Sequence, residues 1–282
     1  MCVTVGALQF KCYNAAMNQT RPPAVAGAFY ANDPATLLRD VQGYLDAVAY
    51  VCEVPPKAII APHAGYVYSG PVAASAYKLL HPLKNKIARV VLLGPCHRVA
   101  VAGMALCSAD HYATPLGPIN VDHSLDEILL REPGVDVFDA AHAPEHSLEV
   151  QLPFLQVVLG DFELLPIVVG DASPALVAEI LNAAWGGPET LIVISSDLSH
   201  YLDYETARRT DQHACEAIEA LDGAAIANDQ ACGRHPVKGL LETAKRRHMS
   251  VKTLDLRNSG DTAGPKDRVV GYGAWAFWEP QS

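Results

Sequence analysis

The sequence has little positive charge, few charged residues altogether and no long apolar run. Its 282 residues contain 21 Lys and Arg against 31 Asp and Glu, which gives a formal net charge of −10. Proteins that bind nucleic acids neutralise phosphates with Lys and Arg, so this balance argues against a nucleic-acid partner. A membrane-spanning helix needs about 20 consecutive apolar residues. The sequence has no such run, so we expect no membrane partner.

Cysteine is scarce and scattered. The seven cysteines include no CxxC pair, and their odd number is a poor basis for a disulfide framework in a chain of this length. We therefore expect reduced thiols and a cytoplasmic location. The first sixteen residues contain one Lys and lack the apolar core of a signal peptide. We expect residues 1–20 to form a flexible extension before a domain over residues 21–282, with Met17 as an alternative start to Met1.

Several common catalytic motifs are absent as well. The chain has no GxSxG elbow, no HExxH zinc motif, no GxxxxGK phosphate loop and no complete GxGxxG. Ser195 and Ser196 lie near His200, but neither has the flanking glycines of a serine nucleophile. A serine hydrolase is therefore not favoured.

Short apolar runs alternate with segments of helical periodicity. The runs are typical of strands that are buried on both faces. The predicted strands cover residues 58–61, 89–93, 103–107, 120–121, 164–169, 191–195, 251–256 and 269–278. The predicted helices begin at or near residues 34, 71, 125, 147, 174, 203 and 236. This alternation, without a break in composition, predicts a single α/β domain with a central, mostly parallel or mixed sheet flanked by helices.

Polar residues follow several of these strands. His63 and His97 come just after the first two, and Asp197 and His200 follow the strand that ends at Ser195. Ligands in open α/β sheets gather beyond the carboxyl ends of the strands, so these residues are expected to converge on one crevice. Imidazole suits Fe, Zn, Cu and Ni, while hydrogen-bonded structural histidines are the alternative. The remaining histidines are expected at the surface or in turns: His81, His111, His123, His142, His213 and His248.

Cys232 is the candidate for a third metal ligand. It precedes a predicted helix and lies beside Arg234, two features that favour the thiolate form. The alternative is an inert, buried cysteine. Glu145 and His146 stand just before another helix and serve either the site or the cap of that helix. The hydroxyl of Tyr66, just beyond the first strand, is well placed to contact a substrate, and ordinary packing is the alternative.

The longer strings around these residues resemble those of the Memo family, which is named for a mediator of receptor-driven cell motility and is widespread in bacteria and archaea. They run from about Arg21 to the end of the chain. In order, the strings are RPPAVAGAFY, IIAPHAGYVYSG, LLGPCHR, EHSLEVQLPFLQ, SSDLSHY, CGRHP, NSGDTAG and VVGYGAWAF. Memo proteins are similar in fold to the LigB type of class III extradiol dioxygenases, which use non-haem Fe(II). The resemblance therefore implies a LigB-like α/β fold.

The resemblance also implies roles for individual residues. His63, His97 and Cys232 match the metal-binding trio, and His200 matches the acid/base histidine of the dioxygenase site, with Asp197 to orient it. Further candidates for contacting substrate or supporting the ligands are Tyr66, Glu145, His146, Arg234 and His235. Fe(II) is the expected metal. Because a thiol replaces the carboxylate of the dioxygenase triad, Cu and Zn are the alternatives.

Three functions stay open from the sequence. The first is a metal-dependent, dioxygenase-like oxidoreductase that uses O₂ on an unidentified small organic substrate. The second is a binding module, since animal Memo proteins are implicated in phosphotyrosine-peptide recognition, and Arg234, His63 and a helix N-terminus could accept a phosphate. The third is an accessory protein, because bacterial Memo domains often occur with a radical-SAM domain and an AMMECR-type domain. The chain itself has no CxxxCxxC cluster motif.

Overall fold

The computed structural model describes residues 19–49 and 54–280. The expected extension of residues 1–20 lies largely outside these ranges, as do both alternative starts, Met1 and Met17. Thr20 and Arg21 already belong to a strand, β1 (Thr20–Arg21). Within the described residues, no helix combines the length and apolar character needed to cross a membrane.

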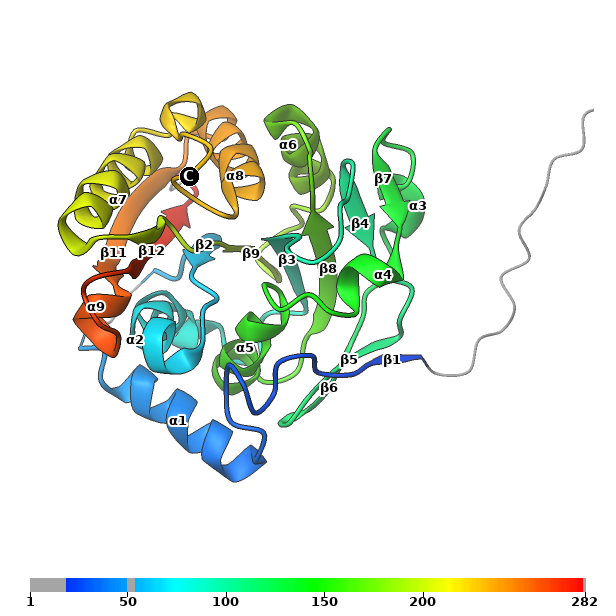
Figure 1. Ribbon diagram of the computed structural model, residues 1–282. Coiled ribbons are helices and arrows are strands. Elements are labelled where there is room, and N and C mark those ends of the chain that lie inside the picture. Colours follow the sequence, from blue (N-terminus) through cyan, green and yellow to red (C-terminus); the bar gives the residue numbers. More distant parts are fainter. Residues whose placement is uncertain (1–18, 50–53, 281–282) are drawn as a thin grey trace, which may run out of the picture.

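Strands and helices alternate along most of the chain (Figure 1). The strands after β1 are β2 (Ala58–Ala61), β3 (Arg89–Pro95), β4 (Met104–Leu106), β5 (His111–Thr114), β6 (Gly117–Asn120), β7 (Val135–Val137), β8 (Glu163–Val169), β9 (Thr190–Ser195), β10 (His200–Leu202), β11 (Ser250–Asn258) and β12 (Val269–Trp278). The α-helices are α1 (Pro34–Asp46), α2 (Tyr66–Tyr77), α3 (Asp126–Leu129), α4 (Asp139–His142), α5 (Leu152–Leu159), α6 (Pro174–Ala183), α7 (Tyr204–Glu219), α8 (Arg234–Arg246) and α9 (Ser259–Thr262). The 3₁₀ helices are η1 (Lys78–Leu83), η2 (Glu149–Gln151) and η3 (Gly223–Ala225).

A large mixed sheet forms the centre of the molecule. Nine strands of the described chain join in it, in the order β10-β12-β2-β9-β3-β8-β4-β7, with β11 paired to the other edge of β12. The four central strands, β2, β9, β3 and β8, are mutually parallel, and the flanking pairs β12–β2 and β8–β4 are antiparallel. The prediction of one α/β domain with a central mixed sheet is confirmed. A second sheet, β1-β5-β6, is small and lies to one side.

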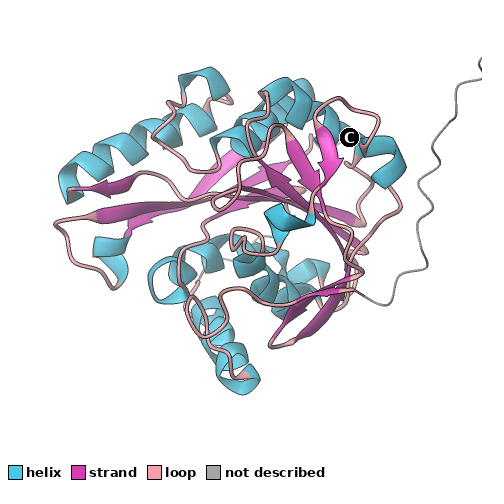
Figure 2. Ribbon diagram, turned by 45° about the vertical axis from the view of Figure 1, so that its right-hand side comes forward, coloured by secondary structure: helices cyan, strands magenta, loops and turns pink. Residues whose placement is uncertain are grey.

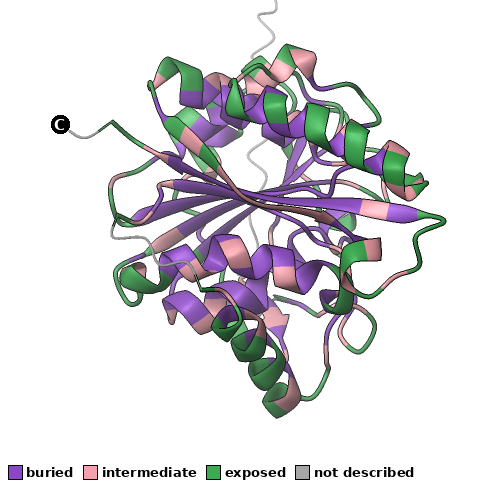
Figure 3. Cartoon of the chain, turned by 90° about the vertical axis from the view of Figure 1, so that its left-hand side faces the viewer, coloured by how far each residue is buried: buried purple, intermediate pink, exposed green. Residues whose placement is uncertain are grey.

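Helices cover both faces of the main sheet, so the molecule has three layers (Figures 2 and 3). Alternate residues of each central strand point into two separate apolar cores, as Val90 and Val91 of β3 do. One core contains the apolar sides of α1, α2 and α5, and the other contains those of α6, α7 and α8. Burial on both faces explains why the central strands read as unbroken apolar runs.

Three predicted helix starts differ from the structure. The helix expected from near residue 147 begins as the 3₁₀ turn η2 at Glu149 and becomes α5 only at Leu152. Helix α2 begins at Tyr66 and has Pro71 inside it, and α8 begins at Arg234 rather than at Pro236. In both cases the apolar period becomes regular only after the proline, whereas the preceding turn is fixed by local contacts such as the bond from the Ser69 amide to the Gly65 carbonyl. By contrast, Asp33 caps α1 as predicted, accepting a hydrogen bond from the Thr36 amide.

The parallel centre of the sheet brings three strand ends to one edge. Ala61 at the end of β2 is in register with Ser195 at the end of β9, and Leu93 near the end of β3 is in register with Ile194. Strand β9 lies between β2 and β3. The loops that follow these three strands therefore meet above one small area.

Candidate metal centre

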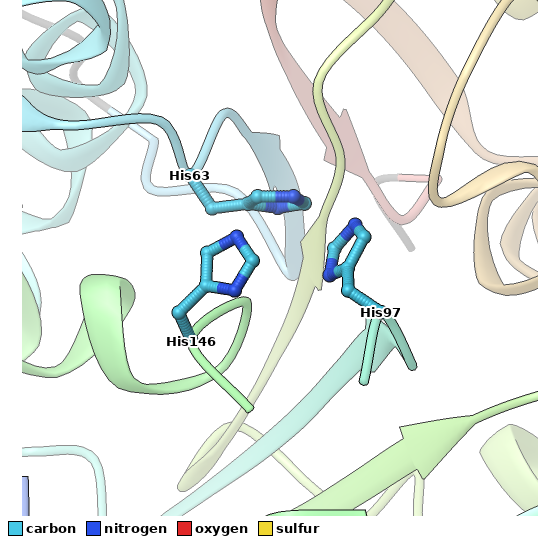
Figure 4. Close-up of side chains that lie close together, drawn as sticks. All are labelled: His63, His97 and His146. Carbon is cyan, nitrogen blue, oxygen red and sulfur yellow. The ribbon is translucent and has the colours of Figure 1, made fainter. Parts of the chain in front are cut away.

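Three histidines converge above the carboxyl ends of the central strands. His63 follows β2, His97 follows β3, and His146 comes from the loop between α4 and η2. One ring nitrogen of each histidine lies within 4.8 Å of the others. The ring centroids are 4.7–5.5 Å apart, and Figure 4 shows the three rings turned toward one another.

A buried chain of hydrogen bonds orients the ring of His63 through its Nδ1 atom. Its Nδ1 lies 2.8 Å from Oγ of Ser195. That hydroxyl donates to the Ser147 carbonyl at 2.7 Å and accepts from the Gln151 side chain at 2.7 Å. Because the Ser195 hydroxyl donates its only proton to the Ser147 carbonyl, it must accept from Nδ1 of His63. Nε2 of His63 is then the nitrogen with the lone pair.

Glu145 orients His97 in the same way. Its carboxylate accepts from the His97 ring Nδ1 at 2.9 Å and from the His97 backbone amide at 2.6 Å. The amides of His146 and Ser147 also donate to Glu145, each at 2.9 Å. Burial alone would raise the pKa of Glu145, but the hydrogen bonds and charge of His97 and the backbone amides lower it to about 2. An ionised carboxylate on one ring nitrogen fixes the tautomer that leaves Nε2 as the ligand atom.

His146 contributes a buried nitrogen without a hydrogen-bond partner. Its Nδ1 is enclosed and forms no hydrogen bond in the described chain, although the Glu145 carboxylate lies 3.3 Å away. Its ring stacks on that of His97 at 4.7 Å. A buried polar atom of this kind is costly unless something binds it. One ring nitrogen of His146, beside two oriented imidazoles, completes a donor set that fits a transition metal or Zn.

The electrostatics of the group favour neutral rings, which are the form that binds a metal. Burial, followed by the nearby rings of His97 and His146, holds the pKa of His63 well below 6.5. Burial likewise lowers the pKa of His146. The site is therefore prepared for a cation without first having to release protons from these two rings.

Cys232 lies at the edge of the histidine group. Its Sγ is 3.4 Å from Nε2 of His63 and accepts from the Asp197 amide at 3.3 Å. Burial and then the charge of Asp197 raise the pKa of the thiol, so the expectation that Arg234 and the start of α8 favour a thiolate is wrong for the metal-free protein. A metal deprotonates a thiol that binds it. The role of Cys232 as a ligand stays a prediction.

Asp197 and His200 lie on the β9 side of the group. Asp197 is 3% exposed, and its carboxylate accepts from the His63 backbone amide at 2.7 Å. Burial raises the pKa of Asp197, against the opposing effect of His200. Nδ1 of His200 donates to the Leu198 carbonyl at 2.8 Å. The ring of the exposed His200 is therefore oriented by a backbone carbonyl.

The other predicted site residues divide into two groups. Tyr66 packs in the core, where it is 4% exposed and its hydroxyl donates to the Val150 carbonyl at 2.7 Å, so a contact with substrate stays a prediction. Arg234 and His235 instead line a cavity of about 410 Å³, together with Cys96 and Cys232. The cavity borders the histidine group through Cys232.

Some of the supporting residues were missed by the sequence reasoning. Ser195 and Gln151 hold His63, although neither was singled out as a support for a ligand. A serine as the last residue of a buried strand is the signal that could have identified Ser195. His142 was expected at the surface or in a turn; it ends the short helix α4 and is only 1% exposed, because its ring forms hydrogen bonds with Tyr112 and the Ala105 carbonyl.

Comparisons with known proteins agree with these observations. A family model described as "Memo-like protein" matches residues 21–276. MEMO1 family proteins from Saccharolobus solfataricus and Aquifex aeolicus are 33% and 37% identical to the chain, over 91% and 90% of its length and 99% and 97% of theirs. A third, from Methanothermobacter thermautotrophicus, is 34% identical over 89% of this chain and 98% of its own.

A solved structure shows the same type of fold. It is an uncharacterized protein from Escherichia coli K12, which is 13% identical and aligns with a TM-score of 0.50 over 77% of this chain and 98% of its own. At this identity the similarity concerns the fold alone. The family match spans nearly all of the described residues and every strand end that carries a histidine, and the chain belongs to the Memo-like protein family.

Proposed function

We propose that this protein is a metal-dependent oxidoreductase that acts on a small organic substrate. The observation that carries the proposal is the group of three histidines, each with one ring nitrogen within 4.8 Å of the others. In His63 and His97, the Nδ1 atoms are hydrogen-bonded to Ser195 and Glu145. Hydrogen bonds to the far ring nitrogen are typical of histidines that bind metals. Three histidines whose roles were only structural would have no reason to bring their ring nitrogens within 4.8 Å of one another.

The proposed ligands are His63, His97 and His146, with Cys232 as an additional sulfur ligand beside His63. Nitrogen and sulfur donors suit Fe(II), Cu and Zn better than Mg or Ca. We propose Fe(II), with Cu as the alternative. When bound, such an ion supplies one-electron chemistry and open positions for O₂ and substrate.

The remaining roles belong to side chains around the group. Nε2 of the exposed His200 accepts a proton from the substrate or returns one, while its Nδ1 stays bonded to Leu198. Asp197 holds the loop of His63 through the backbone amide and balances positive charge on His200. The 410 Å³ cavity next to Cys232 has the size of a small organic molecule.

Metal analysis after anaerobic purification tests the proposal. The native protein is expected to hold close to one equivalent of Fe or Cu, and a His63→Ala/His97→Ala variant is expected to hold none. His81→Ala is the matched control, because His81 is an exposed histidine outside the group. Equal metal contents in all three proteins would contradict the proposal. Measurement of oxygen consumption with catechols and with small aromatic acids then tests the oxidoreductase function.

Two single variants distinguish between the ligand sets. If His146 is a ligand, His146→Ala loses most of the metal and Cys232→Ser retains a substantial part of it. If the ligands are those implied by the family resemblance, Cys232→Ser is the variant that loses the metal. The absorption spectrum provides an independent measure, since a bound thiolate adds intense charge-transfer bands that histidines do not.

A binding protein without turnover is the second candidate. It is favoured by Arg234, which lies at the start of α8 and lines the cavity beside the histidines, where a phosphate or carboxylate could bind. Titration with phosphotyrosine peptides measures this directly. Saturable binding that Arg234→Met abolishes, without any oxygen consumption, would favour this candidate over the enzyme.

A further inference from the structure

The segment that begins at Arg21 has no part in the chemistry proposed above, yet it lies against the loop that supplies His146. We call residues 20–30 the N-terminal strap and residues 142–151 the histidine loop. The strap contains the string RPPAVAGAF from Arg21 to Phe29, followed by Tyr30. The histidine loop contains Glu145, which orients His97, as well as His146 itself.

Arg21 fastens the histidine loop at three points. Its guanidinium donates through Nε to the His142 carbonyl at 3.1 Å, through Nη2 to the Glu145 carbonyl, and through Nη1 to the Glu149 carboxylate. Arg21 is 5% exposed, so these bonds lie away from water. The planar guanidinium fixes three distances at once, which a lysine cannot do.

Glu149, in the histidine loop, is the ionic partner of Arg21. Its carboxylate is completely buried and accepts, besides Arg21, the amide of Ala24 at 2.7 Å, the amide of Val25 at 3.0 Å and the hydroxyl of Tyr30 at 2.5 Å. All four donors come from the N-terminal strap. The charge of Glu149 is therefore compensated by the strap and by nothing else that the structure describes.

The strap also touches His146 directly. The ring of Phe29 packs edge-on against the ring of His146, with centroids 4.9 Å apart. The Phe29 carbonyl in turn accepts from the amide of Tyr66 at 2.8 Å, at the start of α2. The strap thus contacts the histidine loop at one end through Arg21 and the proposed ligand His146 at the other end through Phe29.

We propose that the N-terminal strap sets the positions of Glu145 and His146, and that Arg21 is a positioning residue of the metal centre. The inference rests on the proposed function, because it takes the histidine group to be a metal site. The histidine loop has only short helical turns of its own, so its shape depends on contacts from outside. Without the guanidinium the Glu145 carbonyl loses its partner, and the carboxylate of Glu145 no longer holds His97 in a fixed place.

A structural role in stability alone is the alternative, and Arg89 offers a control for the removal of a paired arginine that lies away from the histidine loop. Arg89 also pairs with a buried carboxylate, that of Asp122, and it also donates to a second group, the Ser124 hydroxyl at 2.8 Å. It lies at the opposite end of β3 from His97. Arg21→Met and Arg89→Met each remove one arginine of a pair, but only Arg21→Met affects the histidine loop.

Two measurements test the inference, one with metal and one without. Co(II) titration, followed by its visible absorption bands, is expected to show affinity weakened about 10–100-fold in Arg21→Met, with a changed spectrum. Arg21→Lys is expected to fall between Arg21→Met and the native protein, and Arg89→Met to match the native protein. In the metal-free proteins, amide hydrogen exchange of residues 143–148 is expected to accelerate in Arg21→Met and not in Arg89→Met.

The outcomes separate the inference from the proposed function. Native protein that binds no Co(II) contradicts the metal site, and hydrogen exchange then still decides whether the strap positions the loop. Native affinity, spectrum and exchange in Arg21→Met overturn the inference while leaving the metal site intact. If Arg21→Met does not fold, Tyr30→Phe and Phe29→Leu replace it. Each removes one contact of the strap, and unchanged Co(II) spectra in both would overturn the inference.

Discussion

Arg21 and Arg89 are both paired with interior carboxylates, but the two pairs differ in their access to water. The Arg89 side chain is 25% exposed while that of Asp122 is 3% exposed, so one partner can keep part of its hydration. The side chains of Arg21 and Glu149 are 3% and 0% exposed. Breaking a partly exposed ion pair lowers the free energy of unfolding only slightly, because the remaining charge can be hydrated. Breaking an enclosed pair leaves a charge that has neither water nor an ionic partner. Loss of the Arg21–Glu149 pair is therefore expected to disturb the surrounding structure more than loss of the Arg89–Asp122 pair.

The largest effect is expected from breaking the enclosed pair. Replacing Glu149 by Ala should lower the free energy of unfolding by about 3–5 kcal/mol, because Arg21 would remain buried and unpaired. Replacing Asp122 by Ala should cost about 1–2 kcal/mol, because Arg89 can turn to water. Urea denaturation followed by circular dichroism measures both. Equal losses would mean that exposure does not separate the two pairs.

Lowering the pH should destabilise the region around Arg21 more than the region around Arg89, because His142 lies beside Arg21. Burial lowers the pKa of His142, whose carbonyl binds Arg21, from 6.5 to about 4. The unfolded chain binds a proton at this residue below pH 6.5, while the folded chain does so only near pH 4. Stability from this group is thus complete above pH 6.5 and falls by about 3 kcal/mol as the pH drops to 4.

The measurement is the free energy of unfolding at several pH values between 7 and 4. A His142→Asn variant is expected to be less stable at pH 7 but to have a shallower pH slope, reduced by up to one proton. His123→Asn is the control, since His123 is exposed and lies beside Asp122. Parallel slopes for His142→Asn and the native protein would exclude His142 as the acid-sensitive group.

The histidine loop can also be displaced from the side that faces β3. A Cβ at Gly94 would lie 2.7 Å from Oγ of Ser147 and 2.9 Å from Cδ2 of Leu148. Gly94→Ala should therefore push the loop outward, cost about 1–3 kcal/mol and weaken Co(II) binding. Gly43→Ala in α1, where a Cβ meets nothing within 4 Å, should be neutral or stabilising and leave Co(II) binding unchanged. Unaltered Co(II) binding in Gly94→Ala would show that the loop position is not critical.

The smallest effect is expected far from both pairs. Asp33 caps α1 through the Thr36 amide at 2.9 Å. Asp33→Ala should lower the free energy of unfolding by about 1 kcal/mol without changing Co(II) affinity. It calibrates the other variants, because a loss of metal binding in Asp33→Ala would mean that global destabilisation alone weakens the site.

The strand ends could be predicted from the sequence because each central strand is a short apolar run that stops at a breaker. Ala58–Ala61, Arg89–Leu93 and Leu191–Ser195 were all predicted within two residues of the observed bounds. Parallel pairing then places His63 and His97 at the same edge of the sheet, and the structure brings them together. The short strands β5, β7 and β10 were not predicted, because runs of three or four residues carry no clear period.

The position of His146 could not be predicted in the same way. It lies in a loop without periodicity, so the sequence placed it only near the site, as a helix cap or a supporting residue. Its nitrogen reaches the other two histidines because Arg21, Glu149 and Phe29 fix the loop over a separation of more than 100 residues. Contacts of that range depend on the complete fold and leave no local pattern.

The place of β9 between β2 and β3 has a consequence for how the site assembles. His63, His97, His146 and the strap all precede β9 (Thr190–Ser195) in the sequence, but β9 must still enter between β2 and β3. Neighbouring strands are about 4.8 Å apart, so the two histidine-bearing strands reach their final separation only when β9 is inserted. We therefore expect the histidine group to assemble only after β9 has paired with both strands. During refolding, the appearance of Co(II) absorption would report the insertion of the central strand.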